Sequence, residues 1–266
     1  NSPPPRKSLG QHFLPESFCH KMVARLKLPE RSRVLEIGAG PGALTRSLLT
    51  AGHRVVSVEI DDRFEAPSDS ADLRWIRGDF LELDLDQTPI AQEPGPWRVV
   101  ANIPYYITTP ILQKLLGPDR ARFTDLYLLM QTEVAERILA EGQRESGALT
   151  LFIQYHAVPT GVLRVPGRTF HPPARVDSTF LHLALRPAPP VSTDPALLFD
   201  VIHLAFGQRR KMLRTTLRQA WAPHVLEAAF QQSGVEATER PERLSLQQFA
   251  RLADALPQRI ARRVDE

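Results

Sequence analysis

Short apolar segments alternate with amphipathic segments over the first half of the chain. The apolar segments are nearly continuous in apolar residues, which predicts buried strands. They span residues 33–37, 54–59, 73–79, 97–102 and 125–130. The stretches between them carry apolar residues at helical spacing, and one of them, ALTRSLLTAG, ends at a glycine as helices commonly do. Strands that alternate with helices predict an α/β fold with a mostly parallel, doubly wound sheet.

The pattern changes near residue 187. ALTLFIQYHA (148–157) and DSTFLHLAL (177–185) are expected to be late strands, the second because its apolar residues alternate. RPAPPVSTDP (186–195) predicts a stiff linker, because proline restricts φ, and the patterns beyond it are helical with no strand between them. We therefore expect an α/β domain with a basic N-terminal arm over residues 1–187 and a small all-helical domain over residues 188–266.

Composition excludes some classes of protein. Of the 266 residues, 42% are hydrophobic and 24% are charged, and no apolar run reaches the roughly 18 residues that a membrane span needs. Cys19 is the single cysteine, which excludes an internal disulfide and a multi-cysteine zinc site. We expect a cytoplasmic protein with no metal site. The net charge of +3 and the pI of about 9.2 are compatible with a nucleic-acid partner but do not require one.

Candidate chemistry gathers where the first three strands end. EIGAGPG places Gly38, Gly40 and Gly42 between a strand and a helix, where glycines allow a sharp turn and a close approach of a ligand to the backbone. The second strand ends at Glu59, a position from which an acid accepts hydrogen bonds from ribose hydroxyls in such folds. Asp79 follows the third strand and could reach an adenine amino group. Taken singly, these are a tight turn and two solvated acids, but together they predict a nucleoside pocket at one edge of the sheet.

The glycine spacing favours one class of nucleotide. A dinucleotide site would typically carry G-x-G-x-x-G, whereas the third glycine here is Gly42 and alanine, Ala43, stands at the last position of that fingerprint. No P-loop lysine follows, which disfavours ATP hydrolysis. The pattern E-x-G-x-G-x-G with a downstream strand-end acid instead resembles the S-adenosylmethionine motif of Rossmann-like methyltransferases.

The fourth strand ends in the unusual sequence VVANIPYYITTP, residues 99–110. Beside a methyl donor, the Asn102 side-chain oxygen and a main-chain carbonyl at Ile103 or Pro104 could accept the N–H groups of an adenine N6. These contacts would orient the nitrogen and favour sp³ geometry, and catalysis would be mainly positioning and electrostatic. Pro104 restricts the local φ, and Tyr105 offers a face on which a base can stack. A structural turn with a buried tyrosine is the alternative.

These motifs resemble the ribosomal RNA adenine N6,N6-dimethyltransferases, and the resemblance covers nearly the whole chain. The matching segments are LGQHFL, LEIGAGPGALT, VEID, GDFLELDL, NIPYYITTPIL, MQTEVAERI, FHPPARVDS, FGQRRKMLRTTL and LSLQQFARLADAL. GQRRKMLRTTL and the last helix are more similar to the KsgA-type enzymes of the small subunit than to the Erm-type enzymes of large-subunit rRNA. The resemblance implies dimethylation of N6 on two adjacent adenosines near the 3′ end of 16S rRNA, with S-adenosylmethionine as donor, during small-subunit assembly. Erm-type 23S rRNA methylation is the second candidate.

The resemblance also implies roles for single residues. The residues expected to bind the donor are His12, Leu14, Gly38, Gly40, Glu59, Asp79 and Asn102. The residues expected to handle the target adenine are Asn102, Pro104, Tyr105 and Phe170. Within these sets, His12 and Leu14 would close over the donor, and Phe170 would stack opposite Tyr105. Outside this motif context, a loop histidine is more commonly a surface residue, and a phenylalanine before His-Pro-Pro is more commonly a packing residue.

One stretch departs from the family pattern. The residues between Glu59 and Asp79 leave little room for the helix that usually joins these two strands, and Pro67 shortens that helix further. Either the helix is trimmed or residues are absent from the sequence. The adenine side of the donor pocket is therefore the part where the resemblance is weakest.

A cationic run without acids, GQRRKMLRTTLRQAW, is the candidate RNA surface. Its expected RNA-binding residues are Arg209, Arg210, Lys211, Arg214 and Arg218. On a continuous helix, Arg210, Arg214 and Arg218 would share one face, which could equally be an ordinary solvated face. Arg6 and Lys7 would add to the same field.

The expected partner is 16S rRNA within a 30S assembly intermediate, and we expect the enzyme to be a monomer that binds no membrane. Two rival functions remain at this point. One is a ribosome assembly factor that keeps the fold without the activity, and the other is a DNA adenine methyltransferase.

Overall fold

The computed structural model describes residues 3–6, 9–93, 95–140, 147–208 and 211–257. The chain divides into two compact units. The first unit comprises Asn1–Ala135 and Val158–Leu185, and the second comprises Glu136–Ala157 and Arg186–Glu266. Each unit has its own cluster of buried apolar side chains, so each has a core of its own.

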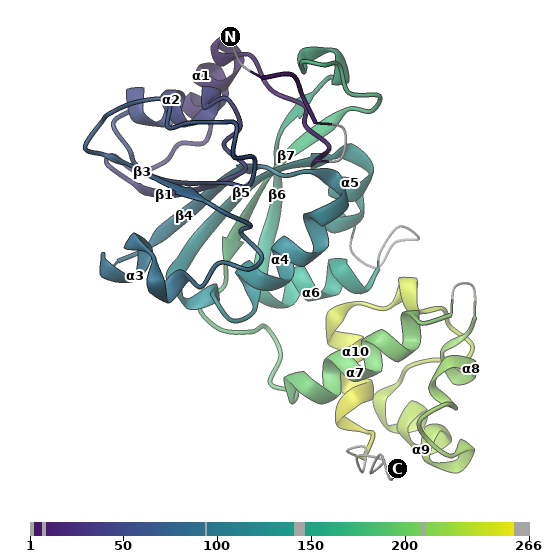
Figure 1. Cartoon of the computed structure of the whole chain (residues 1–266). Coiled ribbons are helices and arrows are strands. Elements are labelled where there is room, and N and C mark those ends of the chain that lie inside the picture. The colour runs from purple at the N-terminus through teal and green to yellow at the C-terminus, as the bar shows by residue number, and fades with distance from the viewer. Residues whose placement is uncertain (1–2, 7–8, 94, 141–146, 209–210, 258–266) are drawn as a thin grey trace, which may run out of the picture. The chain divides into compact units, whose positions relative to one another are not determined.

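The first unit is built on a seven-stranded sheet with the order β3-β2-β1-β4-β5-β7-β6. The strands are β1 (Arg33–Ile37), β2 (Arg54–Glu59), β3 (Leu73–Arg77), β4 (Trp97–Asn102), β5 (Phe123–Gln131), β6 (Ala157–Val165) and β7 (Ser178–Leu185). β1 to β5 are parallel, and β7 runs antiparallel to β5. The expected doubly wound α/β sheet is confirmed (Figure 1). Its strand order reverses between β1 and β4, and ligands of such sheets bind at the carboxyl ends of the strands beside this reversal.

Helices cover both faces of this sheet. They are α1 (Glu16–Arg25), α2 (Ala43–Thr50), α3 (Pro89–Gln92), α4 (Thr108–Leu116) and α5 (Thr132–Leu139). Figure 1 shows α1 and α2 on one side of the sheet and α4 on the other. Met22 of α1 and Leu48 of α2 pack in one cluster with Val34 and Val100 of the sheet. The next residues along those strands point to the opposite face, because side chains of a strand alternate.

The segment between β2 and β3 contains no helix, although all of its residues, 60–72, are described. β2 and β3 are therefore joined here without the helix that the family resemblance led us to expect. The segment crosses the glycine-rich turn as an irregular loop that buries Phe64. Pro67 lies so close to Gly42 that a Cβ at Gly42 would come within 2.5 Å of the proline ring.

The expectation that residues 148–157 form a strand is wrong. Residues Ala148–His156 form helix α6, and the strand that precedes β7 is β6, which begins at Ala157. A short apolar run cannot be assigned to strand or helix by periodicity alone. Leu151 and Tyr155, one helical turn apart, are buried in the core of the second unit, so the packing selects the helix.

The second unit is helical within the described residues. Its helices are α6, α7 (Pro195–Phe206), α8 (Leu213–Leu217), α9 (Pro223–Ser233) and α10 (Leu246–Asp254). A capping box of Ser245 and Gln248 starts α10. Residues 186–194 form no helix or strand, as expected of the linker. In the part of the chain that the structure describes, no helix is long and apolar enough to cross a bilayer.

The expected continuous helix across the cationic run is also wrong. α7 ends at Phe206, and α8 begins only at Leu213. The N–H groups of Leu213 and Arg214 donate to the carbonyl oxygens of Glu239 and Ala237, at 3.0 and 3.1 Å. These bonds to a distant loop replace the bonds that a continuous helix would make with the preceding turn.

Candidate active site

The glycine-rich turn after β1 places backbone where side chains would not fit. Gly38, Gly40 and Gly42 have φ values of 75°, 53° and 79°, a region that favours glycine. The N–H of Gly38 donates to the carbonyl of Val58 at 2.8 Å, which ties the turn to β2. A Cβ at Gly38 would meet only the Asn102 carbonyl oxygen, at 3.8 Å, whereas a Cβ at Gly40 would lie 2.7 Å from the Phe13 ring. The backbone at Gly38 is therefore open for a ligand.

Glu59 ends β2 as a buried carboxylate held by main-chain donors. Its Oε2 accepts from Gly40 N at 2.6 Å, and its Oε1 accepts from Asp61 N at 2.8 Å. Burial raises the pKa of Glu59 above its usual value, although these two hydrogen bonds act in the opposite direction. Each oxygen keeps a second acceptor position, so the group can also accept from a ligand hydroxyl.

Asp79 follows β3 on the same edge of the sheet. Its Oδ1 accepts from the N–H of Leu81 at 2.8 Å, which holds the half-buried side chain at the start of a turn. Its Oδ2 remains available as an acceptor. The main chain joins this position to Glu59, because Gly78 N donates to the Glu59 carbonyl at 2.9 Å.

Asn102 ends β4 and is half-buried. The N–H of the next residue, Ile103, donates to Leu129 O at 3.3 Å, which continues the pairing with β5 one residue further. The Asn102 Nδ2 donates to the main-chain carbonyl of His12 at 2.9 Å, so the Oδ1 of the same amide remains as an acceptor.

After Asn102 the chain forms a 3₁₀ turn, Tyr105–Ile107, in which the carbonyl of Pro104 accepts from Ile107 N at 3.2 Å. The Tyr105 side chain lies outside what the structure describes.

Residues 9–13, which we call the strap, cross this edge of the sheet. The strap is held at its end by a pair of main-chain hydrogen bonds between Phe13 and His171, at 2.9 and 2.7 Å. His12 Nδ1 lies 2.8 Å from the carbonyl oxygen of Pro172. Gln11 Nε2 donates to the Asp61 carboxylate at 2.9 Å. Together with the bond from Asn102 to the His12 carbonyl, these contacts come from three separate segments, which position the strap.

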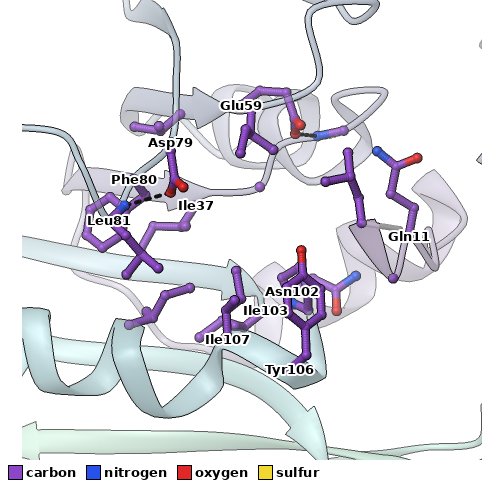
Figure 2. A pocket seen from close by; sticks show the side chains of 18 of the residues that line it. Gln11, Ile37, Glu59, Asp79, Phe80, Leu81, Asn102, Ile103, Tyr106 and Ile107 are labelled. Carbon is purple, nitrogen blue, oxygen red and sulfur yellow. Dashed lines mark hydrogen bonds between the residues drawn. The ribbon is translucent and has the colours of Figure 1, made fainter. Parts of the chain in front are cut away.

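The strap, the glycine-rich turn and the ends of β2, β3 and β4 enclose a cavity of about 180 Å³. Figure 2 shows Glu59 and Asp79 on one side of it and Asn102 and Tyr106 on the other. The cavity brings together seven of the predicted site residues. They are His12, Gly38, Gly40, Glu59, Asp79, Asn102 and Pro104.

These residues fit S-adenosylmethionine. The open backbone at Gly38 accommodates a chain lying against it, the buried Glu59 carboxylate suits a ribose diol, and the free Oδ2 of Asp79 suits an exocyclic amine. Apolar side chains such as Ile37 and Phe80 supply the walls that an adenine ring requires.

Leu14 and Phe170 do not line the cavity, contrary to expectation. Leu14 is 7% exposed and Phe170 is 3% exposed, and both belong to the apolar core beneath the strap. Phe170 touches the site only through the edge of the His12 ring, with ring centroids 6.4 Å apart. The pairing of Phe13 with His171 draws this segment against the strap, so the Phe170 ring packs inward instead of presenting a face.

Some lining residues could not be foreseen from the sequence motifs. Tyr106 lines the cavity with 60% of its surface exposed, and Ile60 lines it with 51% exposed. Gln11 lines it as well, from the strap. Only Tyr106 carried a signal, since a second aromatic residue directly follows Tyr105.

The structure places the cationic run only in part. Arg209 and Arg210 lie outside the described residues. Lys211, Arg214 and Arg218 are exposed, and the last two border a groove that also includes Glu227 and Glu236. Arg214 lies within α8 and Arg218 directly follows it, so these two are one turn apart.

The chain is similar to known proteins over most of its length. A family model described as ribosomal RNA adenine dimethylase matches residues 4–258. The ribosomal RNA small subunit methyltransferase A of Synechococcus elongatus is 41% identical over an alignment of 270 positions, which covers 95% of each chain. The protein of the same name from Shouchella clausii is 40% identical over 265 residues, covering 94% of this chain and 89% of that one.

Two solved structures share the fold over most of the chain. A dimethyladenosine transferase from Plasmodium falciparum has a TM-score of 0.74 at 24% identity, covering 91% of this chain and 96% of that chain. The 23S rRNA methyltransferase ErmE has a TM-score of 0.68 at 26% identity, covering 92% and 99%. The chain therefore belongs to the ribosomal RNA adenine dimethylase family, whose members use S-adenosylmethionine as the methyl donor.

Proposed function

We propose that this enzyme dimethylates N6 of two adjacent adenosines near the 3′ end of 16S rRNA in a 30S assembly intermediate. The relatives at 40–41% identity are named for the small subunit, whereas the large-subunit enzyme ErmE is 26% identical. This difference favours the small-subunit target over an Erm-type target. We further infer that the enzyme acts as a monomer in the cytoplasm, where bacterial ribosomes are assembled.

The observation that carries the proposal is the position of Asn102. Its amide lies at the end of β4, across the cavity from Glu59 and Asp79 (Figure 2). A ligand whose ribose and adenine are held by those two acids would extend its reactive end along the glycine-rich turn toward Asn102. An inactive assembly factor would have no need for an intact donor cavity that opens beside such an amide.

The bound donor supplies an electrophilic methyl carbon. The chain must present the adenine N6 to it, with the lone pair aligned for in-line attack. The Asn102 Oδ1 accepts one N6–H, and the main-chain carbonyl of Ile103 accepts the other. We assign Ile103 in preference to Pro104 because the Pro104 carbonyl already shares its lone pairs with one donor, the N–H of Ile107. The donor would lose its methyl group as the N–C bond forms and would keep the carbon–sulfur electron pair on sulfur; the methylated N6 would then be acidic and could release its proton to solvent. No strong general base is needed.

Aromatic side chains would hold the target base. Tyr105 remains the proposed stacking residue on the grounds of the sequence. The structure supports Tyr106 as the second aromatic in place of Phe170, because its ring is exposed beside Asn102 whereas Phe170 is buried. An extruded base loses its stacking partners in the RNA, and such rings replace them.

The helical unit is the proposed RNA-binding domain. Lys211, Arg214 and Arg218 are exposed cations that can neutralise phosphates, and Arg209 and Arg210 extend the same run in the sequence. Contacts to the phosphate backbone of the RNA would thus position the substrate, while the cavity recognises the adenine.

The decisive experiment is mass mapping of methylated adenosines after incubation with the purified enzyme and methyl donor. The substrates are 30S particles from a strain that lacks this activity, matched 50S particles and adenine-containing duplex DNA. Dimethylation of two adjacent adenosines near the 16S 3′ end is expected. Methylation of 23S rRNA or of DNA alone would support the rival enzymes, and no methylation of any substrate would support the inactive assembly factor.

A further inference from the structure

We propose that Asp61 is a positioning residue for the methyl donor, because it fastens the strap over the donor cavity through Gln11 and Arg6. Asp61 itself does not line the cavity. The inference rests on the donor cavity and does not depend on which RNA is methylated.

Asp61 is an unusually well bonded carboxylate. Its side chain is 0% exposed, and it accepts from Arg63 Nε at 2.8 Å and from Arg63 Nη2 at 2.6 Å. Gln11 Nε2 donates to it at 2.9 Å, and Arg6 Nη1 lies 3.4 Å away. These donors hold the pKa of Asp61 well below its usual range, with the Arg63 hydrogen bonds as the largest cause. The group is therefore a permanent anion at neutral pH, which suits a fixed anchor.

The bonds run from this carboxylate to the N-terminal segment and not only within its own loop. Gln11 uses both ends of its amide, because its Oε1 accepts from Arg6 N at 2.7 Å while its Nε2 donates to Asp61. Arg63 extends the contact through Nη1, which donates to the Pro4 carbonyl at 3.1 Å. One carboxylate thus organises residues on both sides of the turn that leads into the strap.

The same carboxylate is coupled to the donor site. The main-chain N–H of Asp61 donates to Glu59 Oε1 at 2.8 Å, and Glu59 lies two residues away. Further along the same loop, the Phe64 ring packs edge-on against Phe13 of the strap, with centroids 5.7 Å apart. The loop from Ile60 to Phe64 therefore holds the strap at two places while it orients the cavity carboxylate.

The strap contributes a full wall of the cavity, including Gly10, Gln11 and His12. Its other anchors are the Asn102 and His171 contacts, which lie toward its carboxyl end. In the part of the chain that the structure describes, Asp61 is the residue outside the N-terminal segment that accepts a hydrogen bond from the Gln11 side chain. Removing one charge-assisted hydrogen bond of this kind corresponds to roughly a 10- to 100-fold change in an equilibrium constant. Donor affinity should fall by that factor if the strap must be closed for the donor to stay bound.

The test compares Asp61→Asn with Asp62→Asn in the full chain. Asp62→Asn removes the same charge one residue away, but the Asp62 side chain is 80% exposed, and within the described residues its ion pair is with Arg6, at 3.8 Å. Calorimetric titration with S-adenosylmethionine alone, without RNA, gives the dissociation constant. We expect Asp61→Asn to raise it roughly 10- to 100-fold, and Asp62→Asn to leave it within about twofold. In rRNA methylation assays, Asp61→Asn should raise KM for the donor while kcat at saturating donor stays near the parent value.

Gln11→Ala provides a second variant in case Asp61→Asn folds poorly, because Gln11 is half-buried and lies in a loop. It should raise the donor dissociation constant in the same direction, and hydrogen exchange of residues 9–13 should accelerate in both variants. The two losses should add incompletely in the double variant, since both changes break the Gln11–Asp61 hydrogen bond, although Gln11→Ala also removes a side chain that lines the cavity.

Parent-like donor affinity in Asp61→Asn and Gln11→Ala would overturn the proposal, and so would additive losses in the double variant. A lowered kcat with unchanged donor affinity would overturn it too. Because the calorimetric readout uses only the donor, a wrong assignment of the RNA target would leave this result unaffected.

Discussion

The Asn102 side chain donates a 2.9 Å hydrogen bond to the main-chain carbonyl of His12, ninety residues earlier in the chain. This bond connects the Asn102 amide, which we propose holds the target nitrogen, with the strap, which covers the donor cavity. The amide is thereby fixed in one orientation, with its nitrogen committed and its oxygen left as an acceptor. Preorganisation of this kind lowers the cost of aligning a substrate.

Replacing Asn102 with alanine should nearly abolish methyl transfer. Removing one preorganised group at the reacting atom costs about 100- to 1,000-fold in kcat. Donor affinity should fall by less than about tenfold, because the strap keeps its contacts with His171 and Asp61. Single-turnover transfer of a radiolabelled methyl group and calorimetry with the donor measure the two quantities. If the alanine variant methylates at the parent rate, Asn102 has no role in transfer.

Gly40→Ala should disrupt the donor site specifically. A Cβ at Gly40 would lie 2.7 Å from the Phe13 ring and would push the strap away from the glycine-rich turn. Gly52→Ala is the matched control, because Gly52 also has a positive φ, 84°, but has no heavy atom within 4 Å of the added Cβ. Both variants should lose about 1 kcal/mol of stability from backbone strain. Only Gly40→Ala should bind the donor at least about tenfold more weakly, and equal affinities in the two variants would contradict the close packing of Phe13 on this turn.

Tyr106→Ala should weaken RNA binding, whereas Tyr106→Phe should behave like the parent. The ring is 60% exposed beside the cavity, and stacking of a base on such a ring contributes about 1–3 kcal/mol. The effect should appear in KM for RNA, and a fluorescent adenine analogue at the target position should report reduced stacking. The same comparison at Tyr105 tests the residue chosen from the sequence. A decrease of equal size in the phenylalanine variant would assign the effect to the hydroxyl group.

Glu36 should make stability depend on pH. It lies in β1, fully buried, where Thr45 and Ser57 donate to its Oε2 at 2.6 and 2.7 Å. No group among the described residues donates to its Oε1. Burial raises the pKa of Glu36 from an ordinary 4.5 to about 7. Between these values the folded protein holds a proton that the unfolded chain releases, so stability is full below the lower value and falls as pH rises through about 7.

The size of this effect is on the order of 3 kcal/mol. Urea unfolding of the parent and of Glu36→Gln, each at about pH 5 and about pH 8, measures it because the difference between the two proteins isolates this group. The glutamine variant has no such titration, so it should lose less stability than the parent at the higher pH. An identical pH dependence in both proteins would show that Glu36 does not titrate in this range.

Replacing Arg214 and Arg218 together with glutamine should weaken RNA binding at all sequences. For each arginine that neutralises a phosphate, its removal should reduce the slope of log affinity against log salt by about 0.7 for single-stranded RNA. Arg243→Gln is the control, because Arg243 is exposed in the same unit but pairs with Glu239 at 3.8 Å. Filter binding across a salt series measures the slopes. A slope unchanged in the double variant would remove these two residues from the RNA surface.

Much of the site followed from local pattern. The strand ends at Glu59, Asp79 and Asn102 could be predicted from the hydrophobic runs that precede them. The parallel order of the strands brings these residues to one edge of the sheet. The glycine-rich turn could be predicted because backbone positions with positive φ values favour glycine.

The rest depended on contacts between distant segments. Phe170 turned out to be buried because His171 pairs with Phe13, and the cationic run breaks before α8 because Leu213 and Arg214 bond to a loop near residue 239. Neither of these long-range pairings can be predicted from the local sequence, since periodicity depends only on residues a few positions apart.

The sequence by itself thus determined the α/β architecture, the family and the acids and amide at the strand ends, because periodicity and spacing are local properties. Only the tertiary structure decided that the strap is held by Asn102 and Asp61, that Tyr106 is the exposed ring and that residues 148–156 are helical. Those outcomes are set by which surfaces pack and which donors meet acceptors across the fold, and a segment's own residues do not specify them.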